Sequence, residues 1–419
     1  MRVPATGLAA VLSLYLALAL PFSRLQRRFA DPRRAATPAT GGSPRPPSVD
    51  VIVPCYNEEP ALLAACLRSL RGQDYQGELA VWVVDDGSGN RAELLPVLEA
   101  EADRAWRVVL LDGNRGKREA QAAALREGRG ELVVTIDSDT SVAPDGIRRI
   151  VAPLGDPRVG AVTGDLRPSN ATASWLTRLI EVRYRLLFER ERAAQGAFGA
   201  VLCCAGPFSA YRRSAVEQVW PHYIGQRFWG GRRVFGDDLK LTNLVLAAGH
   251  RSVYEPTARA ATNVPATLRG FVRQQLRWNR SFYRELPQML RLLPGRGGYL
   301  ALDLAARTLL PPLLAAGLAM ATTDVLRAPA RLPADAGALA LMALASVDLG
   351  PSPARPAGRR FDLLYGLVFV GLLLPARLWA ACTLFHNGWG IRKLRAAQRG
   401  MLASSLRALR SPASLPFSR

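Results

Sequence analysis

The sequence predicts an α/β domain, built on a mainly parallel sheet, with membrane-spanning segments on both sides of it. Between Val49 and about Ala261, short runs rich in Val and Ile, such as VDVIVP and ELVVTIDSD, alternate with stretches of helical periodicity such as KREAQAAALREG. This alternation is typical of buried parallel strands covered by amphipathic helices. Acidic residues recur where the apolar runs end, which is the edge at which open α/β sheets place their ligands.

The uncharged run from Ala5 to Phe22 is long enough to span a bilayer. A cleaved signal peptide is the alternative, but a single arginine precedes the run and no small-residue cleavage site stands before the basic cluster that follows. By the positive-inside rule, this cluster places the residues after it in the cytoplasm. The cluster consists of Arg24, Arg27, Arg28, Arg33 and Arg34. We predict a transmembrane helix in residues 1–23 and a basic, Pro/Gly-rich linker in residues 24–48.

Two later apolar runs, Tyr299 to Met320 and Phe361 to Phe385, are also long enough to span. Each contains proline or charge, as expected of membrane helices with polar partners. The run Ala336 to Val347 is shorter, so we interpret it as re-entrant or interfacial. Two later spans return the basic tail to the cytoplasm, which predicts three spans in a multi-pass protein of the plasma membrane. The predicted parts are 49–293 for a cytoplasmic domain with interface helices, 294–390 for the second membrane region and 391–419 for the cytoplasmic tail.

The composition limits the partners. With 55 basic and 34 acidic residues, the net charge of +21 suits a nucleic acid, a polyanionic substrate or the anionic lipids of a membrane. Aromatic residues make up only 7% of the chain and the acidic residues gather at strand ends, so we predict no nucleic-acid partner. Three widely spaced histidines exclude a histidine-based zinc site.

Three acidic sites carry the candidate chemistry. In VVDDGSGN, Asp85 and Asp86 could accept hydrogen bonds from a base or a ribose, although a simple turn explains the motif equally well. In ELVVTIDSDT, Asp137 and Asp139 can present two carboxylates to one hard cation, Mg²⁺ or Mn²⁺, that bridges a diphosphate. The wholly apolar strand ahead favours this interpretation over a solvated acidic loop.

The third acidic site is Asp237 and Asp238 in RVFGDDLKLTN. A carboxylate free of the metal can serve as general base for an attacking hydroxyl. The same residues could cap the helix predicted over Leu239 to Ala248. The two interpretations are compatible, because capping by one aspartate leaves the other available.

Two basic clusters complete the candidate site. Lys117 and Arg118 follow a glycine turn at the start of a helix, where an anion such as phosphate is favoured. In RQQLRW, Arg277 could hold a diphosphate and Trp278 could stack on a sugar ring. Position alone favours an interfacial helix for RQQLRW, whereas the acidic strand ends upstream favour the substrate-binding role.

The order of these motifs resembles that of the membrane-embedded processive family 2 glycosyltransferases, in particular hyaluronan synthases and nodulation chitin-oligosaccharide synthases. The motifs are VIVPCYNEE, VVDDGS, GKREAQ, DSD, CCAGPFSAYR, GDDLKLTN and QQLRW. The resemblance covers Val51 to Arg284, and the tail FHNGWGIRKLR is also similar to the ending of hyaluronan synthases. It implies a GT-A-type domain with amphipathic interface helices at Leu176 to Gln195 and Leu268 to Leu293.

The resemblance also implies roles for individual residues. The uridine and ribose of a UDP-sugar would be bound by Tyr56, Asn57, Glu58, Asp86 and Lys117. Asp137 and Asp139 match the metal and diphosphate motif, and Asp238 matches the general base. The motif that closes the donor site and stacks the acceptor corresponds to Gln274, Arg277 and Trp278.

The expected activity is inverting, processive extension of a β-linked polysaccharide from UDP-sugar donors onto a growing polysaccharide acceptor. The main hypothesis is a hyaluronan synthase type that uses UDP-N-acetylglucosamine and UDP-glucuronate. The alternative is a chitin-oligosaccharide synthase or another membrane polysaccharide synthase, which needs no glucuronate. A transferase that decorates a lipid carrier once normally lacks the QxxRW motif, so its presence disfavours that activity.

Overall fold

The structure is a computed structural model, and it describes residues 5–30, 45–101, 106–224, 227–228, 231–232, 236–328, 337 and 359–386. The basic tail and nearly all of the Ala336 to Val347 run lie outside the described residues. By its internal contacts the chain divides into two units. The helical unit comprises Met1–Arg34, Asn170–Ala200 and Val264–His386. The sheet unit comprises Ala35–Ser169, Val201–Asn263 and Asn387–Arg419. Each unit is described by itself.

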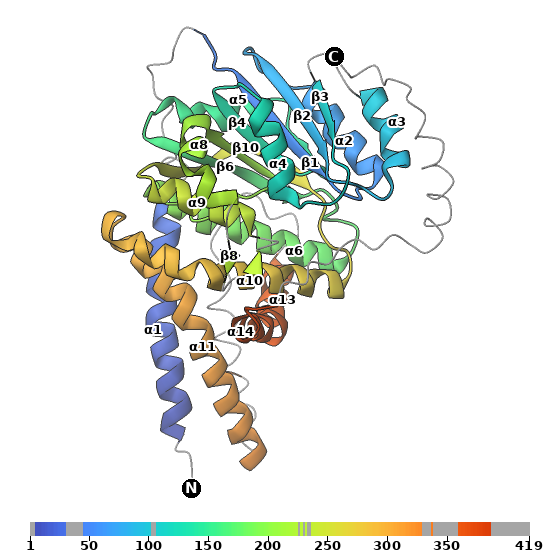
Figure 1. Cartoon of the computed structure of the whole chain (residues 1–419). Coiled ribbons are helices and arrows are strands. Elements are labelled where there is room, and N and C mark those ends of the chain that lie inside the picture. The colour runs from blue at the N-terminus through green and yellow to red at the C-terminus, as the bar shows by residue number, and fades with distance from the viewer. Residues whose placement is uncertain are drawn as a thin grey trace. The chain divides into compact units, whose positions relative to one another are not determined.

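The sheet unit is built on one mixed sheet of 8 strands in the order β3-β2-β1-β4-β7-β6-β10-β5 (Figure 1). The strands are β1 (Val49–Cys55), β2 (Leu79–Asp85), β3 (Trp106–Leu110), β4 (Leu132–Ile136), β5 (Thr140–Val142), β6 (Val159–Pro168), β7 (Phe208–Arg212) and β10 (Arg251–Thr262). Strands β3, β2, β1 and β4 are parallel, as the sequence predicts. The second half is mixed, because β7 runs antiparallel to both β4 and β6, and β5 runs antiparallel to β10. A short antiparallel pair, β8 (Arg227–Phe228) and β9 (Gly231–Arg232), forms a separate sheet.

The helices of the sheet unit are α2 (Pro60–Arg71), α3 (Arg91–Glu101), α4 (Lys117–Glu127), α5 (Gly146–Val151), α8 (Arg213–Ile224) and α9 (Asp237–Ala247). Among them, α4 packs small apolar side chains on the parallel strands β1 and β2. Ala120 and Ala124, one turn apart on α4, pack with Ile52 of β1 and Trp82 of β2 in one buried cluster. This packing fixes α4 against β1 and β2, so the start of α4 lies near the carboxyl ends of those strands.

The helical unit contains the apolar segments. Its helices are α1 (Ala5–Phe29), α6 (Trp175–Arg185), α7 (Ala193–Ala197), α10 (Leu268–Arg291), α11 (Gly298–Arg327), α13 (Arg359–Val368) and α14 (Leu374–Cys382). A π-helical turn, Leu186–Arg192, joins α6 to α7, and another, Phe369–Leu373, joins α13 to α14. Within the described part of the chain, 3 helical segments are long and apolar enough to cross a membrane, in agreement with the predicted number. They are Leu8–Phe29, Gly298–Arg327 and Leu364–Cys382.

Helix α11 contains two consecutive prolines, Pro311 and Pro312. A side chain of α14 replaces one of the helical hydrogen bonds that they remove. Pro311 has no N–H, so the carbonyl of Arg307 one turn earlier loses its helical donor. Arg377 of α14 supplies a replacement, because its Nη2 donates to the Arg307 carbonyl at 2.6 Å. The Arg307 guanidinium in turn binds Asp303 at 2.7 Å and Glu191 at 3.0 Å. Arg377 thus docks α14 on α11 at the turn that the prolines weaken, as membrane helices require.

Candidate active site

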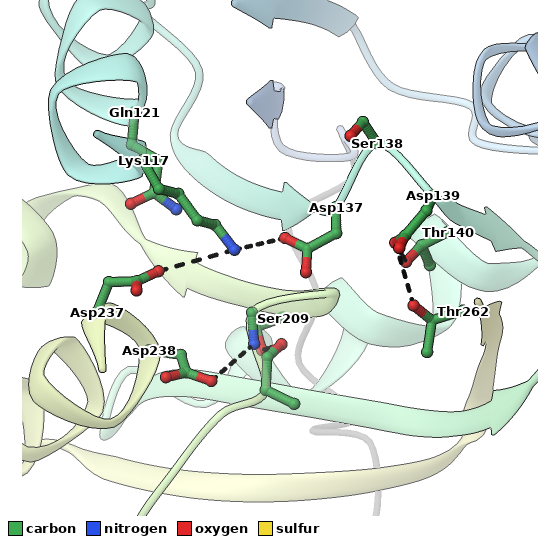
Figure 2. Close-up of polar contacts among 12 residues, drawn as sticks. Lys117, Gln121, Asp137, Ser138, Asp139, Thr140, Ser209, Asp237, Asp238 and Thr262 are labelled. Atoms are coloured by element: carbon green, nitrogen blue, oxygen red, sulfur yellow. Dashed lines mark hydrogen bonds and ion pairs between the residues drawn. The ribbon is translucent and has the colours of Figure 1, made fainter. Parts of the chain in front are cut away.

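The predicted acidic residues gather around one lysine at the carboxyl edge of the sheet. Figure 2 shows Lys117, at the start of α4, reaching between Asp137 after β4 and Asp237 at the start of α9. Its ammonium makes a close ion pair with Asp137 Oδ1 and lies 3.7 Å from Asp237 Oδ2. Burial lowers the pKa of Lys117, but Asp137 and Asp237 raise it by more, so the net shift is upward. The second and third acidic motifs are therefore brought together, with a cation between them.

The position of Lys117 depends on Asp86, which holds the turn before α4. The Asp86 carboxylate accepts hydrogen bonds from the backbone N–H of Arg115 at 2.7 Å and of Gly116 at 2.8 Å. Gly116 has φ 95°, a conformation that favours glycine. Burial raises the pKa of Asp86 and outweighs the two backbone hydrogen bonds, which lower it. The sequence presented Asp86 only as a ligand-binding residue or part of a turn, whereas the structure gives it a structural contact with a second loop.

Asp85, the other carboxylate of the first motif, is turned into the protein. It is 1% exposed and accepts from Arg91 Nε at 2.5 Å and from the Ser88 N–H at 3.3 Å. Gly87, directly after the pair, has φ 70°, and a Cβ there would lie 2.4 Å from the Gly113 backbone. The glycine of the DDG motif is thus required by a close approach between two loops. In this structure Asp85 pairs with an arginine of its own chain.

The loop after β1 is locked to the loop after β2. Asn57, with φ 49°, donates its N–H to Ser88 Oγ at 2.8 Å and accepts from the Gly89 N–H at 2.7 Å. The side chain of Asn90 donates to the Glu58 carbonyl at 2.8 Å. Tyr56, the first of the three residues expected to bind uridine, is partly exposed. These contacts fix the shape of the surface that the YNE motif presents.

Glu58 also reaches the loop after β4. Its carboxylate is buried, accepts from Ser138 Oγ at 2.8 Å and accepts from the Glu59 N–H at 3.0 Å. Ser138 is the central residue of the Asp-Ser-Asp motif, so Glu58 sets the position of the loop that carries both aspartates. Cys66 of α2 supports the same loop, with its Sγ 3.7 Å from the Asp137 carbonyl. Neither contact was visible as a sequence pattern.

Asp137 and Asp139 could supply two carboxylate ligands to a divalent cation whose other ligands come from water and from the substrate. Asp139 Oδ1 accepts from Thr262 Oγ1 at 3.2 Å, which orients this carboxylate (Figure 2). Among the residues that the structure describes, no group of three or more His, Cys, Asp or Glu side chains could hold a metal ion. Mg²⁺ is typically held by one or two carboxylates together with waters and substrate phosphates, and Mn²⁺ has similar ligand preferences. The donor set therefore fits a cation whose remaining ligands are phosphate oxygens and water.

Asp238 is partly exposed and lies beside the buried Asp237. Its Oδ1 accepts from the Leu239 N–H at 2.8 Å and its Oδ2 from the Gly206 N–H at 3.3 Å. Burial raises the pKa of Asp238, and the neighbouring Asp237 raises it further, while Lys117 opposes the rise. The N-cap of α9 is Gly236, without a side-chain capping bond. The predicted capping role is therefore wrong, because both aspartates already lie in the first helical turn.

The remaining predicted residues are Arg118 of α4 and three residues of α10. Arg118 stacks over the ring of Tyr223 at 5.2 Å, and the Tyr223 hydroxyl donates to Gln121 at 2.8 Å. Gln274, Arg277 and Trp278 lie on α10 of the helical unit, where the Trp278 ring is 6.3 Å from the ring of Tyr184. The side-chain oxygen of Gln274 is buried without a hydrogen-bond partner. Most buried polar atoms in folded proteins have a hydrogen-bond partner.

Comparison with known proteins is consistent with this geometry. Residues 46–281 match the model of the family described as glycosyltransferase like family 2. The chain is 46% identical over 390 residues to an N-acetylglucosaminyltransferase of Sinorhizobium fredii (strain NBRC 101917 / NGR234), covering 92% of this chain and 94% of that protein. It is 39% identical over 389 residues to an N-acetylglucosaminyltransferase of Rhizobium meliloti (strain 1021), covering 92% and 91%.

Among solved structures, the fold is similar to that of a mannosyltransferase from Pyrobaculum calidifontis, solved in complex with GDP-Man and Mn²⁺. The TM-score is 0.63 at 24% sequence identity, covering 90% of this chain and 99% of that chain. This likeness shows the fold, which is the GT-A type expected from the sequence. Because the family model spans more than half of the chain, and relatives match over nearly their whole length, the chain belongs to family 2 of the glycosyltransferases.

Proposed function

We propose that the chain is an inverting N-acetylglucosaminyltransferase that extends a β-linked N-acetylglucosamine oligosaccharide from UDP-N-acetylglucosamine. The observation that carries the chemistry is the convergence of Asp137, Asp237 and Asp238 around Lys117. The donor sugar is supported by the names of the relatives, which are N-acetylglucosaminyltransferases at up to 46% identity. Those names favour the chitin-oligosaccharide alternative over the hyaluronan type that we placed first from the sequence.

The donor is proposed to bind along the carboxyl edge of β1, β2 and β4. The loop with Tyr56 and Asn57 would face the uracil and ribose, and Lys117 would contact the diphosphate. Asp137 and Asp139 would hold Mg²⁺ or Mn²⁺, which neutralises charge on the leaving diphosphate when it is bound. The fold neighbour solved with GDP-Man and Mn²⁺ supports a divalent cation as cofactor.

Asp238 is proposed as the general base. An inverting transfer proceeds by one displacement, in which an acceptor hydroxyl attacks the anomeric carbon and loses its proton to a base. The upward shift in the pKa of Asp238 brings its proton affinity closer to that required at neutral pH. The Gly206 N–H and the Leu239 N–H each hold one carboxylate oxygen, so the group is fixed in orientation.

The QxxRW residues of α10 are proposed to complete the donor site and to stack the acceptor. Support comes from the buried, unpartnered oxygen of Gln274 and from Trp278, whose indole is partly exposed beside Tyr184. An apolar ring face is a common platform for a sugar. The basic residues in the last turn of α1, Arg27 and Arg28, support a cytoplasmic position for the sheet unit by the positive-inside rule.

The test is product analysis with membranes that contain the full chain. Given UDP-N-acetylglucosamine and Mg²⁺ or Mn²⁺, we expect an oligosaccharide that a chitinase digests and a hyaluronidase does not. Addition of UDP-glucuronate should leave the product unchanged. A product that forms only with both donors would instead assign the hyaluronan type.

Two substitutions test the proposed roles within that assay. Asp238→Asn should abolish transfer, and unaltered release of UDP would refute the general-base assignment. Trp278→Ala should abolish elongation while the protein stays in the membrane. If Trp278 were only an interfacial anchor, the variant would either lose membrane attachment or elongate normally.

A further inference from the structure

The ammonium of Lys117 pairs with Asp137, one of the two carboxylates proposed to hold the divalent cation. Its Nζ makes a close ion pair with Asp137 Oδ1, and Asp237 Oδ2 lies 3.7 Å away on the opposite side (Figure 2). The side chain of Lys117 is only 18% exposed and that of Asp237 only 12%, so water screens this arrangement weakly. The Asp137 side chain is 31% exposed, and a cation that binds its Oδ1 competes with this ammonium.

The site has few protein ligands whose binding to a metal ion could offset the loss of the Lys117–Asp137 ion pair. Among the described residues no third His, Cys, Asp or Glu side chain joins Asp137 and Asp139 in a metal-binding group. A nucleotide diphosphate favours metal binding in two ways. Its phosphates attract the ammonium away from Asp137, and they supply oxygen ligands to the metal. A lysine suits such an exchange, since its charge is compact and its stem has four flexible bonds.

Resting on the proposed function, we propose that Lys117 is an internal counter-ion that keeps Asp137 from binding the divalent cation until the donor diphosphate arrives. Metal binding and donor binding are then coupled, and the site holds a metal only weakly without its donor. Gly206 allows this position of the ammonium, because a Cβ at residue 206 would lie 2.9 Å from Lys117 Nζ. Gly206 thus leaves the room that the ammonium uses in the donor-free state.

The experiment measures Mn²⁺ binding to the detergent-solubilised full chain by electron paramagnetic resonance, without nucleotide and then with UDP. For the wild-type chain we expect weak Mn²⁺ binding that UDP strengthens by about tenfold or more. Lys117→Met removes the competing ammonium and its charge-assisted bond, so it should tighten Mn²⁺ binding without UDP by about tenfold or more. The added benefit of UDP should shrink by the same factor.

Two further variants separate this mechanism from a general change in charge. Arg126→Met removes one positive charge from the exposed end of the same helix, where Arg126 lies 3.9 Å from Glu119. It should leave Mn²⁺ binding within about twofold of wild type, because an exposed charge is screened. Gly206→Ala keeps the lysine but crowds its Nζ, and it should also tighten Mn²⁺ binding in the absence of UDP.

The inference is overturned if Lys117→Met and Gly206→Ala both bind Mn²⁺ without UDP no more tightly than the wild-type chain. It is also overturned if the gain in Lys117→Met equals the gain in Arg126→Met. Failure of the proposed function gives a different result, in which the wild-type chain forms no oligosaccharide from UDP-N-acetylglucosamine. Loss of the gained affinity in Lys117→Met/Asp137→Asn would locate the exposed ligand at Asp137.

Discussion

Replacement of Asp86 by asparagine separates a structural role of this carboxylate from a ligand-binding one. In the structure Asp86 accepts the N–H of Arg115 at 2.7 Å and that of Gly116 at 2.8 Å. An asparagine keeps one acceptor oxygen but directs an NH₂ group at the other donor, so one partly buried N–H loses its partner. Such a loss, together with the loss of charge assistance, costs about 2 to 3 kcal/mol. For a domain of this size, that corresponds to a fall in Tm of about 5 to 10 °C.

The assay is thermal unfolding of the purified chain without donor, followed by intrinsic tryptophan fluorescence. Asp74→Asn is the matched control, because Asp74 is an exposed acid of the same unit whose ion pair with Arg148 spans 3.1 Å. We expect this control to change stability by less than about 1 kcal/mol. If Asp86→Asn unfolds at the same temperature as Asp74→Asn but binds UDP more weakly, Asp86 acts on the ligand and not on the turn.

Three further outcomes are expected. Asp50→Asn breaks a buried ion pair with Arg213 at the other end of β1, so it should lower the free energy of unfolding by about 3 to 5 kcal/mol, measured by denaturant titration. Because the pKa of Asp238 is raised, the acid limb of the kcat profile should lie above the range of an ordinary aspartate near about 4, and a limb at that value would contradict the assignment. Arg377→Met frees the Arg307 carbonyl and should cost about 1 to 2 kcal/mol in detergent, less when Pro311→Ala restores the missing N–H.

The first half of the fold could be predicted from sequence because its pattern is local. Apolar runs separated by amphipathic helices correctly indicate β1, β2 and β4, with the helices α2 and α4 between them. The reversed direction of β7 could not be predicted in the same way. A strand buried on both faces shows the same apolar run whether it runs parallel or antiparallel, so Phe208–Arg212 carries no signal of its direction. The π-helical turn at Leu186–Arg192 is likewise invisible to a periodicity argument, because its extra residue shifts the helical face within one turn.

The acidic groups of the candidate site could be predicted because they follow apolar strands directly. The contacts that position them could not be predicted, since each joins segments far apart in the sequence. Glu58 and Ser138 are 80 residues apart, and Asp86 and Gly116 are 30 apart. In the sequence, all of these appear simply as polar residues in loops. Only the order of the strands in the sheet brings the loops together, with β1 between β2 and β4.

These contacts divide the polar residues into two groups with different consequences for mutation. Glu58 and Asp86 hold loops, so we expect their loss to displace Asp137 or Lys117 and to weaken binding at the proposed donor site, even if neither residue touches the donor. Their effect on binding therefore cannot be interpreted without a stability measurement on the donor-free chain. Asp137 and Asp237 face an ammonium on a flexible stem, and their charge is compensated by a group that can leave. A site that accepts a metal and a diphosphate, and releases both after transfer, needs its charge balanced in each state. In the proposed mechanism, Lys117 provides that balance when the donor is absent.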